Sequence, residues 1–188
     1  PTPSPGTINR QFQTNAPPQI RQVTHSPQQP HPADPIVLTA KVTDPDGVAT
    51  VSALVQDVSP GAYLPAFLSL DHATLLANPT ADLPVNPAYT NAANWTVIPM
   101  LDDGLGDDAL AGDGIYTATL AARQENRHLV RYKIRAQDTL GAEVTVPTAD
   151  DPSLNLACFV YEGVPPYTAS VASVHPDGPG HVYDTNLL

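Results

Sequence analysis

The chain has 188 residues, 41% of them hydrophobic, which suits one well-buried domain of ordinary size with tails. Its 22 prolines and 11 glycines exclude a protein of long helices, because a proline inside a helix removes a backbone donor and clashes with the preceding turn. The formal net charge of −11 disfavours nucleic acid and anionic membrane surfaces as partners, and no apolar run approaches the roughly 18 residues of a membrane span.

The first third of the chain predicts a linker followed by three strands. Residues 1–16 are rich in proline, threonine and asparagine, as linkers are. Because the chain starts without methionine, we expect it to be a piece of a larger protein, with a domain that begins at Pro17. Apolar residues that alternate with polar ones, separated by turn residues, then predict strands at 19–25, 36–44 and 48–58.

Residues 59–94 predict a long insertion between strands. They are interrupted by prolines and contain one apolar segment, at 66–78, that suits a short helix. Three aromatic residues flank or occupy the insertion: Tyr63, Tyr89 and Trp95. Exposed aromatic rings hold sugars in many sandwich modules, so these three are candidate carbohydrate-binding residues. The alternative is that they pack inward, because burying a large ring removes much apolar surface from water.

The rest of the domain predicts further strands at 94–100, 114–122, 129–138, 142–148 and 156–162. The segment 129–138 alternates most clearly, with one apolar face formed by Val130, Tyr132, Ile134 and Ala136. Seven or eight short strands joined by turns are typical of an all-β fold, an antiparallel two-sheet sandwich. The alternation ends after Gly163, and residues 164–188 read as a second linker or as the start of a following domain.

The segment "LDDGLGDDALAGDG" is an acidic, glycine-rich loop between two of these strands. Its aspartates could supply several of the six to eight oxygens that calcium prefers: Asp102, Asp103, Asp107, Asp108 and Asp113. The spacing does not fit an EF-hand, because position six counted from Asp102 is an aspartate instead of glycine. The alternative is a structural turn without a cofactor, in which aspartates bond the backbone and glycines adopt positive φ.

The strand expected at 129–138 carries basic residues on its second face. Arg131, Lys133 and Arg135 alternate with the apolar residues, and five of the eight basic residues lie between positions 123 and 135. One interpretation is a docking face for an acidic partner or a neighbouring domain. The other is a solvated strand face that resists aggregation and balances nearby aspartates.

No group of residues predicts a catalytic site. The single cysteine, Cys158, excludes an intramolecular disulfide and lies in an apolar strand, where a buried and inert thiol is expected. His72 stands beside Asp71, but neighbours in sequence rarely form a triad, and no nucleophile elbow is present. We therefore expect a protein that is not an enzyme.

Several segments together resemble the immunoglobulin-like module of large secreted bacterial proteins. They are "PPQIRQVTHSPQQP", "VTDPDGVATVSALVQ", "DDGLGDDALAGDGIYTATL", "RYKIRAQDTLG" and "DDPSLNLACFVYEGVP", within roughly residues 17–164. The resemblance implies an immunoglobulin- or fibronectin-III-like sandwich and a non-catalytic accessory module, of a kind commonly found next to a spore-coat-H-type kinase domain. The region 59–94 is longer than the resemblance leads us to expect.

These observations predict a spacer or interaction module of a multidomain, secreted or cell-surface bacterial protein. Its expected partners are neighbouring domains of the parent chain or another protein, without nucleic acid and without membrane insertion, and the isolated module is expected to be a monomer. The alternative function is that of a calcium- or carbohydrate-binding sandwich module, which would use the acidic loop and the insertion.

Overall fold

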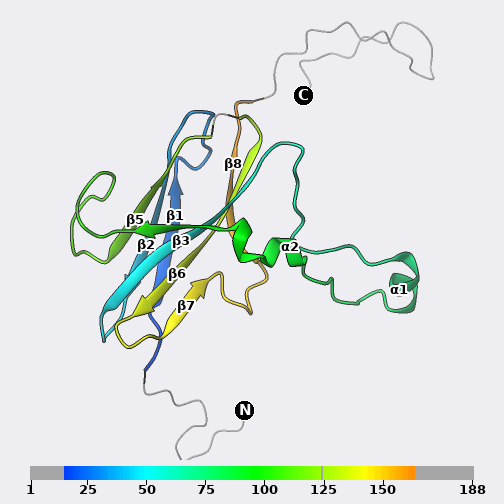
Figure 1. Cartoon of the computed structure of the whole chain (residues 1–188), viewed down its shortest axis with the longest axis horizontal. Coiled ribbons are helices and arrows are strands. Elements are labelled where there is room, and N and C mark those ends of the chain that lie inside the picture. Colours follow the sequence, from blue (N-terminus) through cyan, green and yellow to red (C-terminus); the bar gives the residue numbers. More distant parts are fainter. Residues whose placement is uncertain (1–14, 124, 164–188) are drawn as a thin grey trace, which may run out of the picture.

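The computed structural model describes residues 15–123 and 125–163 and shows two antiparallel sheets that form a sandwich (Figure 1). The first sheet has the order β1-β2-β5, with β1 at Gln19–Ser26, β2 at Ile36–Thr43 and β5 at Ile115–Leu120. The second sheet has the order β4-β3-β6-β7, with β4 at Thr96–Met100, β3 at Val48–Val58, β6 at His128–Asp138 and β7 at Glu143–Val146. A further strand, β8 at Leu156–Val160, also pairs with β6.

The predicted all-β sandwich is confirmed, and each strand overlaps a segment for which the sequence predicted one, with β1 and β6 each extending one residue beyond it. The long strand β6 pairs with β3 along one edge, while its other edge is shared by β7 and β8. The linkers predicted at 1–16 and 164–188 lie outside the described residues, apart from residues 15 and 16.

The two sheets pack through one apolar layer. From the first sheet, β2 contributes Ile36, Leu38, Ala40 and Val42, and none of them is more than 2% exposed. From the second, β6 contributes the predicted apolar face, Val130, Tyr132, Ile134 and Ala136, again at most 2% exposed. A strand turns alternate side chains to opposite faces, so the residues between these four, Arg131, Lys133 and Arg135, lie on the outer face of the second sheet.

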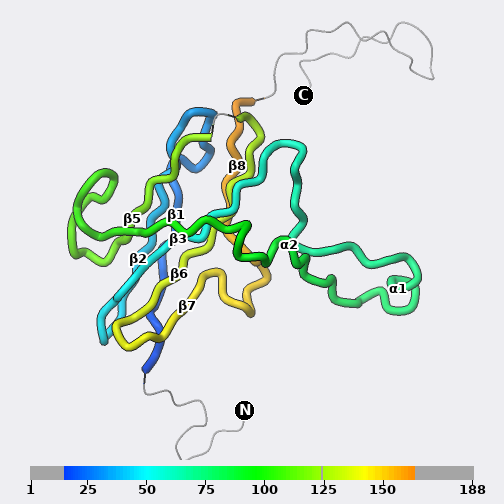
Figure 2. The backbone as a smooth tube through the Cα atoms, viewed as in Figure 1, coloured from blue at the N-terminus to red at the C-terminus, as the bar shows by residue number. Residues whose placement is uncertain are grey.

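The insertion at 59–94 contains three short helices: α1 at His72–Ala77, α2 at Pro87–Thr90 and the 3-10 helix η1 at Ala92–Asn94. Asp71 caps α1 by accepting a hydrogen bond from the backbone N–H of Thr74. The part that contains α1 projects from the sandwich, on the side away from the acidic loop (Figures 1 and 2). Within residues 15–123 and 125–163, no helix has the length and apolar character needed to cross a membrane.

The described chain enters and leaves the sandwich at opposite ends (Figure 2). The segment before β1 lies at one end of the sheets, and β8 finishes at the other.

Candidate functional site

The insertion returns over the outer face of the second sheet, where the basic residues of β6 lie. Asn86 fixes this return, because its side-chain oxygen accepts from the backbone N–H of Ala88 while its amide donates to the carbonyl of Pro65. Pro87 then occupies the first helical position of α2, where its missing N–H costs nothing. The result is a short helix that presents Tyr89 to the sheet, where this residue is only 1% exposed.

Basic and aromatic side chains alternate above β6. The guanidinium carbon of Arg131 lies 5.7 Å from the ring centre of Tyr63 and 5.5 Å from that of Tyr89. The Nζ atom of Lys133 lies 5.3 Å from the ring centre of Tyr89 and 4.8 Å from that of Trp95. These distances are those of cation–π contacts. Two candidate groups that the sequence kept separate therefore form one structure, the cation–aromatic stack, with the members Tyr63, Arg131, Tyr89, Lys133 and Trp95.

Arg131 is buried within the stack. Arg131 is only 5% exposed, and its Nη1 donates to Gln56 Oε1 at 3.1 Å and to the carbonyl oxygen of Leu64 at 2.7 Å. Within the described residues no carboxylate forms an ion pair with Arg131. The sequence predicted an open strand face, and this expectation is wrong at Arg131, because the insertion covers it. Here the cation joins the insertion to the sheet.

The aromatic members do not form a flat exposed platform. Tyr89 is buried, and its hydroxyl donates to the carbonyl oxygen of Leu154 at 3.1 Å and to Asn155 Oδ1 at 2.9 Å. Burial raises the pKa of Tyr89, and the charge of Arg131 opposes this in part. The ring of Trp95 stands at 84° to that of Tyr89, so the two cannot stack on one face of a sugar. Tyr63, at 70% exposure, is the one ring of the three that is largely open to solvent.

The outer end of the stack opens into a pocket of about 260 Å³, hereafter the basic pocket, lined by Leu54, Thr90, Ala92, Trp95, Val97, Lys133 and Arg135. Lys133 is partly buried, and this burial lowers the pKa of its ammonium group. Among the described residues Lys133 has no ion-pair partner, and Arg135 has a long contact of 3.8 Å with Glu143. Two cations beside an aromatic ring and aliphatic side chains suit an anionic group that has an apolar neighbour.

The acidic loop is held by its own carboxylates. Asp102 Oδ1 accepts from the backbone N–H groups of Gly112 and Asp113, at 2.6 and 3.2 Å, and its Oδ2 accepts from that of Gly114 at 2.9 Å. Gly112 and Gly114 have φ values of 76° and 80°, a conformation that glycine adopts without strain. Asp102 therefore closes the loop onto the start of β5, as the structural-turn interpretation requires.

The other four candidate ligands also bond within this region. Asp103, Asp108 and Asp113 accept from backbone N–H groups, those of Leu105, Gly104 and Ile115 respectively, and Asp107 accepts from the hydroxyl of Thr119. Across residues 15–123 and 125–163, no three His, Cys, Asp or Glu side chains gather in an arrangement that could hold a metal ion. The observed contacts favour the structural turn over a calcium site.

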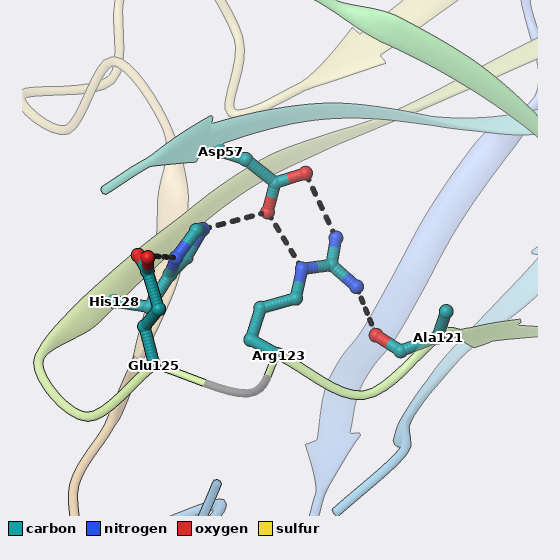
Figure 3. A network of polar contacts seen from close by, with 5 residues as sticks. All are labelled: Asp57, Ala121, Arg123, Glu125 and His128. Atoms are coloured by element: carbon teal, nitrogen blue, oxygen red, sulfur yellow. Dashed lines mark hydrogen bonds and ion pairs between the residues drawn. The ribbon is translucent and has the colours of Figure 1, made fainter. Parts of the chain in front are cut away.

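A polar network at one end of the sandwich was not predicted from the sequence (Figure 3). Asp57, at the end of β3, receives two hydrogen bonds from Arg123, from Nε at 2.8 Å and from Nη2 at 2.9 Å. The same carboxylate lies 3.2 Å from His128 Nε2, and Glu125 lies 3.9 Å from the other ring nitrogen. Arg123 also donates to the carbonyl oxygen of Ala121. Because Asp57 and Arg123 are 66 positions apart, sequence spacing gave no signal for this network.

This network pairs a histidine with a carboxylate, an arrangement that some catalytic sites also use. An Asp–His pair can activate a nucleophile, but in the described chain no hydroxyl or thiol is hydrogen-bonded to His128. Cys158 is 6% exposed, and burial raises the pKa of its thiol to about 11, so it is not a thiolate near neutral pH. The prediction of a buried thiol is confirmed, and His72 lies apart from this network, at the start of α1.

Part of the chain matches a known family. Residues 83–151 match the family model described as the conditioned medium factor second Ig-like domain. The matched segment runs from the end of the insertion through β7, and so includes the acidic loop and most of the cation–aromatic stack. No curated protein matches the chain. The match and the two-sheet fold together support an immunoglobulin-like module, a class that is generally non-enzymatic.

Proposed function

We propose that this protein is a non-catalytic interaction module that docks an acidic partner at the basic pocket, beside Lys133 and Arg135. The observation that carries the proposal is the state of Lys133. Its ammonium group is partly buried between two aromatic rings and has no carboxylate partner in the described chain, although the protein is strongly acidic. A buried charge is stabilised by a counter-charge, so a carboxylate from a partner would complete this site.

The shape of the basic pocket supports a carboxylate side chain on a protein over a free inorganic anion. Its walls include the aliphatic side chains of Leu54 and Val97 and the ring of Trp95, which suit the methylene groups of a glutamate. Arg135 offers a planar guanidinium that can bind a carboxylate through two hydrogen bonds, and its contact with Glu143 is long and solvent-exposed, so it is easily exchanged.

A spacer role in a longer secreted protein fits the same module. The two described ends lie at opposite ends of the sandwich, which suits a domain placed in series between others (Figure 1). The resemblance to modules that stand next to a spore-coat-H-type kinase domain supports a bacterial, extracellular parent with such a neighbour. The full reading frame of the parent gene tests this placement, and a frame without a secretion signal and without a further domain would contradict it.

Binding can be followed through Trp95, because it is the single tryptophan of the chain and lines the basic pocket. The probe is an end-blocked hexaglutamate peptide, and the control is hexaglutamine, which has the same shape without the charge. We expect a saturable change in tryptophan fluorescence with hexaglutamate alone, weakened by added salt. An equal response to hexaglutamine, or a response to a neutral glucose oligosaccharide in place of hexaglutamate, would contradict the proposal.

Matched variants assign the binding to the basic pocket. Lys133→Met keeps the aliphatic length and removes the charge, and we expect it to weaken hexaglutamate binding at least about tenfold, as the loss of one charge-assisted hydrogen bond does. The chain has one other lysine, Lys41 on β2 of the opposite sheet, so Lys41→Met is the control with the same change in net charge. Equal weakening by both variants would show non-specific attraction and would overturn the assignment.

A further inference from the structure

A second groove, of about 330 Å³, lies between the edge strands of the two sheets and beside the acidic loop. β4 is the outer strand of one sheet and β5 the outer strand of the other, and the two meet at a single bridge between Leu101 and Thr117. Both backbone hydrogen bonds of this bridge are formed, at 2.9 and 2.7 Å. Beyond the bridge the two strands do not pair, and the groove occupies the space between them.

Pro99 keeps this side of the sandwich open. In the antiparallel register of the bridge, the residues that face each other two positions further on are Pro99 and Thr119. In an antiparallel ladder, every second residue of a strand directs its backbone N–H and C=O to the same edge. Thr117 directs these groups to Leu101, so those of Thr119 point to the same edge, away from β2. Pro99 has no N–H to offer them. Among the described residues no backbone group bonds Thr119 at this edge, so an added strand could pair with it.

The groove combines apolar and acidic surfaces and has no cationic lining residue. Leu101 and Leu105 lie along it and are 54% and 71% exposed. Three aspartates line the same space: Asp103, Asp107 and Asp108.

Each of these carboxylates uses one oxygen for a bond to the loop or to Thr119. No ion pair in the described part of the chain neutralises them, although Asp108 is only 7% exposed. The groove is thus complementary to a long cationic side chain, whose methylene groups would cover the leucines while its charge meets the aspartates.

We propose that this groove binds an extended, lysine- or arginine-bearing segment of a partner protein, which adds to the open edge of β5. The main chain of the segment pairs with Thr119, as in other cases of strand addition. One basic side chain lies over Leu101 and Leu105 and reaches the carboxylates of Asp103, Asp107 and Asp108. This site takes the opposite charge from the basic pocket and shares no lining residue with it, so either proposal can fail without the other.

The test uses end-blocked octapeptides of alternating valine and lysine, and of alternating valine and glutamate, with EDTA present to remove metal ions. Backbone amide shifts of the labelled protein are recorded by NMR. We expect saturable shifts for Thr119 and its neighbours with the lysine peptide and none with the glutamate peptide. A third peptide has proline in place of each valine and cannot form strand hydrogen bonds. Equal affinity for the lysine–proline peptide would overturn strand addition.

Variants locate the charged contact. Asp103→Asn combined with Asp107→Asn keeps the acceptor oxygens that bond Leu105 and Thr119, so the loop is expected to stay folded. We expect this pair of changes to weaken lysine-peptide binding at least tenfold. The control combines Asp44→Asn with Asp46→Asn, in the turn between β2 and β3, and removes the same charge elsewhere. An equal loss of lysine-peptide affinity in both double variants would overturn the proposed site. If either variant fails to fold, the comparison of the three peptides on the wild-type protein decides whether the groove binds a basic strand.

Discussion

The guanidinium carbon of Arg131 lies 5.5 Å from the ring centre of Tyr89, so a strand of the sandwich and a helix of the insertion share one buried contact. Tyr89 continues this connection through its hydroxyl, which bonds Leu154 and Asn155 just before β8. The insertion is therefore anchored to the second sheet at its base, while the part that contains α1 projects (Figure 2).

Arg131→Ala is expected to destabilise the protein strongly. The change removes the Nη1 donor from Gln56 Oε1 and from the Leu64 carbonyl and leaves buried acceptors unpaired, in addition to the lost contacts with two rings. We expect the free energy of unfolding to fall by about 2–4 kcal/mol. Arg135→Ala, four residues further along the same face but partly exposed, should change it by no more than about 0.5 kcal/mol. Urea unfolding measures both, and similar losses would contradict a structural role specific to Arg131.

Asp102→Ala tests the acidic loop as a structural turn. Three backbone N–H groups lose their acceptor, so we expect the free energy of unfolding to fall by about 2 kcal/mol. Asp107→Ala, which removes a single bond to an exposed hydroxyl, should cost less than about 1 kcal/mol.

The same loop is expected not to depend on calcium. Because its carboxylates already bond the backbone, the melting temperature of the wild type should be equal in EDTA and in calcium at about 5 mM, which exceeds the dissociation constants of most weak extracellular calcium modules. A rise with calcium in the wild type that is lost in Asp102→Ala would instead establish the metal site.

Stability is expected to fall at alkaline pH because two buried acids keep their protons in the folded state. Burial raises the pKa of Cys158 from 9.0 to about 11 and that of Tyr132 from 10.0 to about 12. The protonated forms are favoured by folding, so their contribution is complete below the ordinary pKa and is lost as pH rises through the folded value. Between the unfolded and folded pKa values, each group can lower the free energy of unfolding by at most about 1.4 kcal/mol per pH unit.

Urea midpoints at about pH 8 and about pH 10.5 measure this loss, since the thiol loses its proton in the unfolded chain within this interval while the folded pKa of about 11 lies above it. Cys158→Ala removes the thiol and should show a smaller drop over the interval than the wild type, whatever its stability at the lower pH. A drop of the same size in the variant would show that the thiol does not contribute.

The strands could be predicted because their signal is local. In β2 and β6 every second residue is apolar, and this alternation alone determines which face meets the core. The structural role of Asp102 in a turn could also be predicted from the sequence, because aspartate and glycine in one short loop favour hydrogen bonds between carboxylate and backbone.

The burial of Arg131 could not be predicted from the alternation of apolar and polar residues. Alternation places Arg131 on the outer face of its strand, but it does not show that Tyr63 and Tyr89, about 70 and about 40 positions earlier in the chain, pack over that face. Tyr63, Tyr89 and Arg131 are brought together by tertiary structure, as are Asp57 and Arg123. Sequence distance hides such contacts, and a buried cation surrounded by rings reads in the sequence as an ordinary surface residue.

The ionisation of Lys133 offers a direct test of the basic pocket. Burial lowers the pKa of Lys133 below its ordinary value of 10.5, because the neutral amine is easier to desolvate than the ammonium ion. The chain has two lysines, so lysine labelled with ¹³C at Cε gives two NMR signals, and Lys133→Met assigns the one from the pocket. We expect its titration midpoint to lie below 10.5 in the free protein. Saturating hexaglutamate should raise that midpoint, because a bound carboxylate favours the charged form. A midpoint that does not move when the peptide is bound would mean that the peptide lies elsewhere, and the proposed docking at Lys133 would then be wrong.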